Sequence, residues 1–242
     1  MNVYETKTVG EAVSGNSYVG RGIVIGKSED GKNAVCAYFI MGRSENSRNR
    51  IFVKNDDEII IHPFDASKVE DPSLIIYSPV RKTGNKLIVT NGDQTDTIYD
   101  FINDGKSFED ALKTREFEPD APNFTPRISG IIEFSENDFT YKMSILKSAD
   151  EKGSACSRYT FDYPSLCGVG SFIHTYVMDG NPIPTFLGEP ERVSIPNDID
   201  ELFGDIWDNL DKNNKISLYV RYISLENGEM HDRMINVNEC NA

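Results

Sequence analysis

The stretch SYVGRGIVIGKSEDGKNAVCAYFI, residues 17–40, contains two apolar runs separated by a short polar turn. Val, Ile, Phe and Tyr fill both runs, and Asp30-Gly31 lies between them, which predicts two neighbouring strands. Similar runs follow at 50–55 and 58–64, and a hairpin around Thr83-Gly84-Asn85 is expected to join strands at 72–80 and 85–90. The first ninety residues therefore predict a sheet.

The rest of the chain mixes helices with further strands. Helical spacing of apolar residues predicts helices at 93–104, 107–115 and 197–211, and the last of these has one apolar face. Strand-like runs occur at 129–134, 139–147, 157–164, 170–178, 215–225 and 229–238. This pattern predicts a layered α+β protein. No repeat or linker divides it, so we expect a single domain over 1–242, with 1–16 as a loose extension.

The composition excludes several classes of partner. With 39 acidic and 25 basic residues the net charge is −14, which argues against nucleic-acid binding. No segment approaches the 18 apolar residues of a membrane span, and the start of the chain does not resemble a secretion signal. The four cysteines show no CxxC spacing, which is typical of reduced thiols in a cytoplasmic protein.

Common catalytic motifs do not occur. The sequence lacks GxSxG, a legible triad, and a dinucleotide or P-loop fingerprint. A calcium-like loop from Asp211 fails, because Ile216 stands where glycine is needed and Tyr222 where glutamate is needed. The three histidines are scattered and are expected to be structural or surface residues. We therefore expect catalysis, if any, without a metal or organic cofactor.

Three arginines lie in MGRSENSRNR, residues 41–50, which follows the second apolar run. They could be solvated surface residues or a site for a small anion, because arginine forks match phosphate oxygens and serine hydroxyls complete such sites. Arg21 favours the anion site. It stands between Gly20 and Gly22, which permit close approach, on the strand expected to pair with the one that leads into the cluster.

Two other segments concentrate polar groups. TNGDQTDT, residues 90–97, is either a tight turn with a helix cap or a set of ligand-binding amides and hydroxyls. EFEPDAPNFTPR, residues 116–127, places three carboxylates beside prolines that restrict the backbone. Loop carboxylates are usually solvated, so this segment alone does not define a site.

Taken together, five segments resemble the archaeal-type inosine monophosphate (IMP) cyclohydrolase family. They are YVGRGIVIG, YFIMGRSENSR, LIIYSPV, LIVTNGDQTDTI and FEPDAPNFTPRI, in this order between about residues 18 and 133. The resemblance implies a four-layer αββα sandwich similar to N-terminal-nucleophile hydrolases, without their nucleophile. It also implies closure of 5-formamidoimidazole-4-carboxamide ribotide (FAICAR) to IMP with loss of water, the last step of purine synthesis. A non-catalytic purine-nucleotide-binding protein and a related amidohydrolase are the alternatives.

The resemblance also implies site residues. Arg48 is expected to stabilise the oxyanion, Tyr77 to donate a hydrogen bond, and Glu118 to handle the amide proton. An additional residue at Phe124 leaves Glu116 as an alternative to Glu118. The implied partner is a small purine nucleotide, and a homo-oligomer remains open. The implied substrate-binding residues are Arg21, Arg43, Ser44, Asn91, Gly92, Thr95 and Asp96.

Overall fold

The computed structural model describes residues 2, 4–68 and 76–240. Its first hairpin confirms the expectation for 17–40: β1 (Arg21–Lys27) and β2 (Asn33–Met41) pair antiparallel, with Arg21 opposite Ile40. Gly31 turns the chain at φ 74°, a conformation that glycine adopts without steric cost. Strand β1 begins at residue 21 rather than 17, because Gly20 has φ 79° and interrupts the extended backbone.

This hairpin forms the centre of a six-stranded antiparallel sheet. Both faces of β1 and β2 are buried, which explains why their sequences are continuous apolar runs instead of alternating ones. Strand β11 has no counterpart in the sequence prediction. The order of this sheet is β11 (Glu191–Ser194), β10 (Val169–His174), β1, β2, β12 (Lys215–Ser224) and β13 (Met230–Asn236).

A second antiparallel sheet has seven strands, and its order follows the chain. It contains the strands expected at 50–55 and 58–64, the hairpin expected around Gly84, and the long strands that follow the first two predicted helices. Its order is β3 (Ile51–Asn55), β4 (Glu58–His62), β5 (Val80–Thr83), β6 (Lys86–Thr90), β7 (Arg127–Ser135), β8 (Asp138–Ser148) and β9 (Cys156–Pro164).

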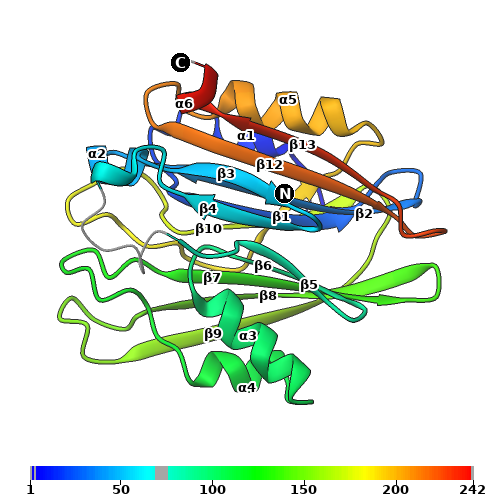
Figure 1. Cartoon of the computed structure of the whole chain (residues 1–242), viewed down its shortest axis with the longest axis horizontal. Helices are drawn as coiled ribbons and strands as arrows, with labels where there is room; N and C mark the ends of the chain where they lie inside the picture. Colours follow the sequence, from blue (N-terminus) through cyan, green and yellow to red (C-terminus); the bar gives the residue numbers. More distant parts are fainter. Residues whose placement is uncertain (1, 3, 69–75, 241–242) are drawn as a thin grey trace.

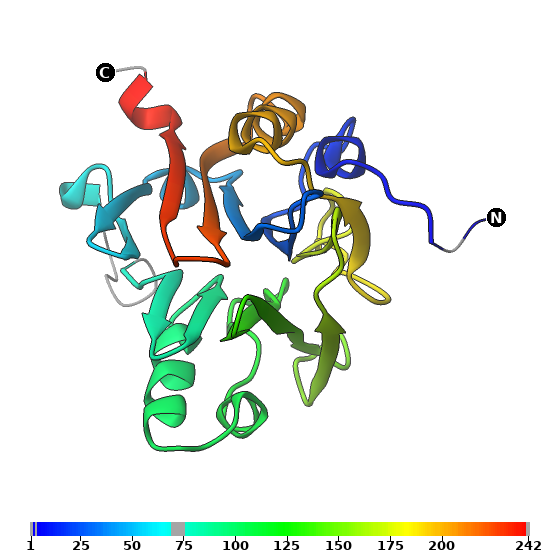
Figure 2. The ribbon, with the colours of Figure 1, turned by 90° about the vertical axis from the view of Figure 1, so that its right-hand side faces the viewer.

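The two sheets face each other across an apolar core (Figures 1 and 2). Ile23 and Ile25 of β1 point into this core, whereas Val24 between them belongs to the core on the other face of the sheet. Burial of each such side chain contributes about 1.5–3 kcal/mol. The alternation therefore fixes which face of each strand meets the second sheet.

Helices cover the outer faces of the sheets. Val13, Leu202 and Ile206 pack on the six-stranded sheet, and Ile98 and Leu112 pack on the seven-stranded sheet. The molecule is thus α+β, with two antiparallel sheets and few helices. The helices are α1 (Val9–Val13), α2 (Glu45–Arg48), α3 (Gln94–Asn103), α4 (Phe108–Lys113), α5 (Ile199–Asn209) and α6 (Val237–Cys240), with a 3₁₀ turn at Ala66–Lys68.

The structure corrects three expectations. The described part of 1–16 is not loose, because α1 packs against α5 and the Gly10 N–H donates to Asp205 Oδ2 at 2.7 Å. The strand expected at 72–80 is absent from 76–79, where β5 begins only at Val80, and 72–75 lie outside the described residues. The strand at 170–178 ends at His174, because the chain then crosses to a small hairpin in which Tyr176 bridges Thr185.

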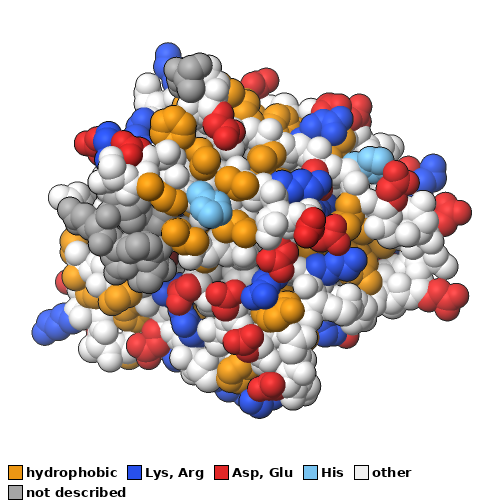
Figure 3. Space-filling view, viewed as in Figure 1, with side chains coloured by type: hydrophobic (Ala, Val, Ile, Leu, Met, Phe, Trp, Pro, Cys, Tyr) orange, Lys and Arg blue, Asp and Glu red, His pale blue; other side chains and the backbone are white. Residues whose placement is uncertain are grey.

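The visible surface carries mixed charges. Figure 3 shows Lys and Arg side chains scattered among Asp and Glu on one face, without a continuous basic area there. Within the described ranges, none of the helices has the length and apolar character needed to cross a membrane.

Candidate active site

A cavity of about 480 Å³ opens where β1 and β7 begin and where β2 and β10 end. Antiparallel pairing of β1 with β2 and β10 brings three of these strand ends together, and β7 comes from the facing sheet. Arg21 and Tyr176, which are both in the wall, are 155 residues apart. We call this space the arginine cavity. It is lined by Tyr18, Arg21, Arg43, Ser44, Asn46, Ser47, Arg50, Glu118, Asp120, Asn123, Thr125, Tyr176 and Ile183.

Arg21 enters the cavity from the first residue of β1. Its Nη1 donates to Met41 O at 3.3 Å, and its backbone N–H donates to Thr175 Oγ1 at 3.1 Å. The flanking glycines are needed for packing: a Cβ on Gly20 would lie 2.1 Å from Thr175 Oγ1, and one on Gly22 would lie 2.2 Å from Phe39. Neighbouring β10 and β2 therefore approach Arg21 closely and fix its position.

Arg50 supplies a second guanidinium to the cavity. Its Nε is buried and has no hydrogen-bond partner among the described residues. Burial and the like charge of Arg21 both lower the pKa of Arg50. Arginine nevertheless stays protonated in proteins, so two positive charges share the cavity without an acceptor for this N–H group. Such an arrangement favours the binding of an anion.

Glu118 brings a carboxylate to the same space. Burial raises the pKa of Glu118, although Arg21 and Arg127 act in the opposite direction. The Glu118 N–H donates to Thr125 O at 2.9 Å, which holds the two ends of the loop together. A buried carboxyl group with a raised pKa, beside guanidinium groups, is suited to accept a proton and return it.

The loop geometry separates Glu118 from Glu116. Phe124 adopts φ 44° and packs edge-on against Phe117 at 5.4 Å between ring centroids. Glu118 lies in the cavity wall. Glu116 is exposed and lies 3.5 Å from Arg158.

Tyr77 lies behind the cavity wall. Its hydroxyl donates to Asn91 O at 2.7 Å and lies 3.1 Å from the hydroxyl of Tyr38. Burial raises the pKa of Tyr77, whereas Arg50 and Arg21 act against that rise. The phenol is thus close enough to influence both guanidinium groups, but its proton is engaged by a backbone carbonyl.

The NGxxTDT segment supports the cavity from behind. Asn91 Oδ1 accepts from Ile128 N at 2.9 Å, and Gln94 Oε1 accepts from Arg127 Nη1 at 2.8 Å. A Cβ on Gly92 would lie 2.5 Å from Arg127 Nη1 and 3.6 Å from Glu118 Oε1. The absence of a side chain at Gly92 therefore leaves room for the buried arginine beside the carboxylate.

Thr95 and Asp96 of this segment do not line the cavity. Thr95 is buried, and its hydroxyl lies 2.6 Å from that of Thr90. Asp96 points to the surface and pairs with Arg81 at 2.9 Å. Both groups are engaged within the protein, but the N-cap residue Asp93 makes no side-chain cap hydrogen bond at the start of α3.

The arginine segment itself divides between cavity and surface. Arg43 and Ser44 line the rim, where Arg43 pairs with Asp179 and lies 5.0 Å from the ring centroid of Tyr18. The Ser44 hydroxyl caps α2 by accepting from Ser47 N at 3.1 Å. The loop expected here is therefore a short helix.

Arg48 points away from the cavity. Its Nη2 donates to Asn213 O and, at 3.1 Å, to Asn214 Oδ1, in the loop before β12. The structure thus places Arg50, and not Arg48, beside Arg21.

The sequence motifs do not identify several of the residues that line the cavity. Arg50 is the last residue of the basic segment 41–50 and the first residue of the strand-like run 50–55, and this position at the start of a strand was the available signal. Tyr176 comes from the second half of the chain and stacks on Tyr18 at 5.8 Å between centroids. Its hydroxyl lies 2.6 Å from Thr125 Oγ1, which in turn donates to Asp120. No local pattern identifies Tyr176, because its partners are about 50 and 150 residues away.

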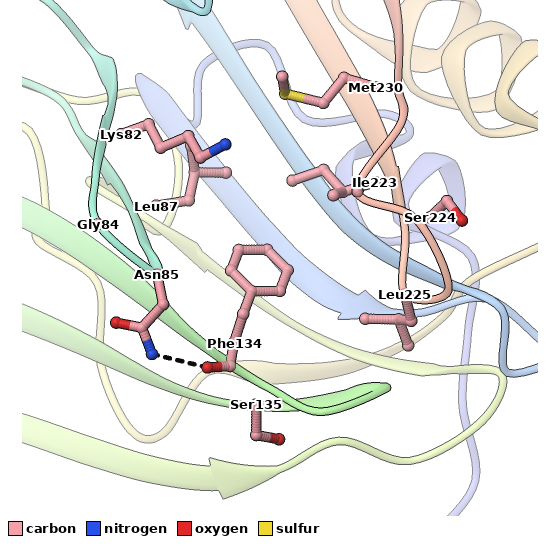
Figure 4. Close-up of a pocket in the computed structure, with 11 residues that line it drawn as sticks. Lys82, Gly84, Asn85, Leu87, Phe134, Ser135, Ile223, Ser224, Leu225 and Met230 are labelled. Carbon is pink, nitrogen blue, oxygen red and sulfur yellow. Dashed lines mark hydrogen bonds between the residues drawn. The ribbon is translucent and has the colours of Figure 1, made fainter.

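A different cavity lies at the opposite end of β7. It measures about 240 Å³ and is largely apolar, with Leu87, Phe134, Ile223 and Met230 around it (Figure 4). The Asn85 amide there donates to Phe134 O at 2.7 Å, so this polar group is already engaged. Unlike the arginine cavity, this space lacks converging charged groups.

Comparison with known proteins identifies the family. The family model for IMP cyclohydrolase-like protein matches residues 18–228. A protein named IMP cyclohydrolase from Methanococcus maripaludis strain S2 is 36% identical over 120 residues, which are 48% of this chain and 58% of that relative. One of the same name from Methanothrix thermoacetophila is 34% identical over 119 residues, 48% of this chain and 57% of the relative.

A longer alignment joins the two halves of the chain. A protein named IMP cyclohydrolase from Methanococcus aeolicus is 30% identical over 196 residues, which cover 74% of this chain and 91% of that relative. The family match also extends well beyond residue 133, where the recognisable motifs end. The chain therefore belongs to the IMP cyclohydrolase-like protein family.

Proposed function

We propose that this protein closes FAICAR to IMP with loss of water. The observation that carries the proposal is the arginine cavity, where Arg21 and Arg50 share a space with Glu118. The reaction needs cationic groups for a phosphate and a developing oxyanion, and a group that moves a proton. The family and the names of the relatives agree with this chemistry.

The reaction forms one bond and eliminates water. The carboxamide nitrogen attacks the formyl carbon, the new C–N bond closes the six-membered ring, and the formyl oxygen becomes negatively charged. The carboxamide nitrogen loses a proton, which converts the oxyanion to a hydroxyl group. The formamido N–H then gives up the second proton, the C–O bond breaks, a C=N bond forms in the ring, and the oxygen leaves as water. Because the two reacting groups belong to the same substrate molecule, orientation supplies a large part of the acceleration, roughly 7–11 kcal/mol in favourable intramolecular cases.

We assign roles from the position of each side chain. Arg21 and Arg50 stabilise the oxyanion, since their charges converge in the cavity and the Arg50 Nε–H has no partner among the described residues. Glu118 accepts the amide proton and returns it to the departing oxygen. Arg43 at the rim exchanges Asp179 for the substrate phosphate.

Other expected site residues take supporting roles in this proposal. Tyr77 positions the guanidinium groups from behind the wall, and Asn91, Gly92 and Thr95 hold the strand ends that carry Arg127 and Glu118. The oxyanion role that the resemblance implies for Arg48 passes to Arg50.

The finer architectural expectations also belong to the proposal. We propose a single domain with the four-layer αββα arrangement of N-terminal-nucleophile hydrolases, supported by helices on the outer faces of two facing sheets. A cytoplasmic location is supported by four free cysteines, all within the described ranges. A homo-oligomer is compatible with this architecture.

The decisive experiment is incubation of the purified protein with FAICAR and chromatographic measurement of IMP. We expect IMP to form at a rate proportional to protein concentration, and Glu118→Gln to lose that rate while Glu116→Gln keeps it. Tight binding of IMP without turnover would instead support the nucleotide-binding alternative. Failure of the protein both to bind IMP and to form it would refute the proposal.

A further inference from the structure

A second polar cavity lies between the edges of the two sheets, away from the arginine cavity. It measures about 590 Å³ and shares no lining residue with the arginine cavity. The first residues of β10, the residues before and within β11, and the last residues of β9 surround it. We call it the Arg192 cavity, and it is lined by Tyr4, Tyr141, Tyr163, Pro164, Leu166, Val169, Gly170, Ser171, Glu189, Pro190, Glu191 and Arg192.

Arg192 is the cation of this cavity. It lies opposite Ser171 in the register of β10 and β11, and the Ser171 hydroxyl is 2.9 Å from that of Tyr141 on the facing sheet. Residues opposite each other in a sheet share one face, so Arg192 points toward the space between the sheets. Its Nε is buried and has no hydrogen-bond partner, and the guanidinium has no ion pair, among the residues that the structure describes.

Glu191, the residue before Arg192, differs from it in having its charge paired. Glu191 is satisfied twice, by His174 Nε2 at 2.9 Å and by the ammonium group of Lys7. Glu191 is therefore engaged elsewhere and does not neutralise Arg192. A buried donor without an acceptor costs about 1–3 kcal/mol, and more when it is charged. An acceptor from outside the chain would recover this energy.

The apolar side chains in the cavity walls indicate the chemical character of the uncharged part of the ligand. Tyr141 and Tyr163 stack with centroids 5.1 Å apart, and Leu166, which is 47% exposed, adds an apolar side chain at the rim. Pro164 and Val169 extend the apolar lining. An aromatic or branched aliphatic body fits such walls, because it buries apolar area and makes favourable contacts with the rings.

Charge balance selects the anion. The cavity lining holds one arginine and two glutamates, of which Glu191 is paired with Lys7 and His174 and Glu189 adds a negative charge. A phosphate monoester carries about −1.5 to −2 charges near neutral pH and would leave excess charge partly desolvated. A carboxylate carries one charge and accepts two parallel bonds from an arginine fork. We propose that the Arg192 cavity binds a small monocarboxylate with an aromatic or branched apolar body.

Titration with 3-phenylpropionate, followed by calorimetry and by the Arg192 Nε–H resonance in ¹⁵N spectra, tests this proposal. The uncharged 3-phenylpropionamide should bind at least about tenfold more weakly, the effect of one charged hydrogen bond. We expect Arg192→Gln to weaken binding of the acid by a similar factor. Leu166→Glu, at an exposed position that does not endanger folding, should also weaken it by adding charge at the rim.

Two controls keep the result specific. Arg158→Gln removes an arginine from β9 outside the cavity and should leave the affinity unchanged, and Glu118→Gln should do the same because it lies in the other cavity. Equal affinity for the acid and the amide, or preferential binding of inorganic phosphate, would overturn the monocarboxylate assignment. No binding of 3-phenylpropionate and no movement of the Nε–H resonance would overturn the site. None of these readouts depends on formation of IMP.

Discussion

Glu118 provides the sharpest test of the proposed chemistry. Glu118→Gln removes the carboxylate while keeping the side-chain shape and the backbone bond from Glu118 N to Thr125 O. Loss of a general acid–base group lowers kcat by about 10²–10⁴-fold, which corresponds to about 2.7–5.4 kcal/mol in the activation barrier. KM should change little, because the proton transfer belongs to the transition state.

Glu116→Gln is the matched control. It makes the same chemical change two residues away, where the carboxylate is exposed and 3.5 Å from Arg158. Exposed pairs of this kind contribute at most about 1 kcal/mol to stability, so Glu116→Gln should stay folded. Its turnover should therefore remain near the wild-type value. Both constants are measured for each variant by steady-state conversion of FAICAR to IMP.

Thermal unfolding across pH separates catalysis from folding. Burial raises the pKa of Glu118 in the folded state above the ordinary 4.5 of a glutamate, although Arg21 and Arg127 act in the opposite direction. The wild type therefore loses stability as pH rises through that folded-state pKa. Glu118→Gln should be more stable than wild type at neutral pH, and the difference should vanish below about pH 4.5. A variant with normal kcat, or a slow Glu116→Gln enzyme, would refute the assignment.

Three further outcomes follow from the geometry. Arg50→Lys should lower kcat by about 10²-fold, as for the loss of an oxyanion donor, whereas Arg48→Lys should stay within about twofold; equal effects in kinetic assays would return the role to Arg48. Gly92→Ala should lower the free energy of unfolding by about 1–3 kcal/mol in denaturant titrations, because its Cβ would lie 2.5 Å from Arg127 Nη1. Asp232 pairs with the fully buried Arg221 at 2.8 Å. Asp232→Asn should therefore lower the free energy of unfolding by about 3–5 kcal/mol. Burial acts to raise the pKa of Asp232, but Arg221 and Lys54 lower it to about 2. The stability that this ion pair contributes should therefore persist above pH 3.8 and disappear as pH falls toward 2. An Asp232→Asn protein with an unchanged acid-unfolding curve would contradict this prediction.

Local sequence patterns were sufficient to predict most of the helices and strands and to recognise the family motifs. Apolar periodicity identified β1, β2 and most later strands, because a strand buried on one or both faces must be apolar there whatever its partners are. The Ser107–Asp110 capping box was also predictable, since both partners are three residues apart. The arginine segment was recognised as a candidate anion site because its composition is unusual in an acidic chain.

Which polar side chains meet depends on the three-dimensional arrangement of the strands. Arg48 and Arg50 are two residues apart, yet α2 directs the first toward Asn214 and the chain entering β3 carries the second into the cavity. Tyr176 joins the site through the pairing of β10 with β1, at a separation that no local pattern encodes. Arg192 likewise faces the space between the sheets only because β11 pairs with β10. The apolar pattern within a segment indicates which of its residues are buried. The meeting of charged side chains in a cavity instead depends on contacts between strands that are distant in the sequence.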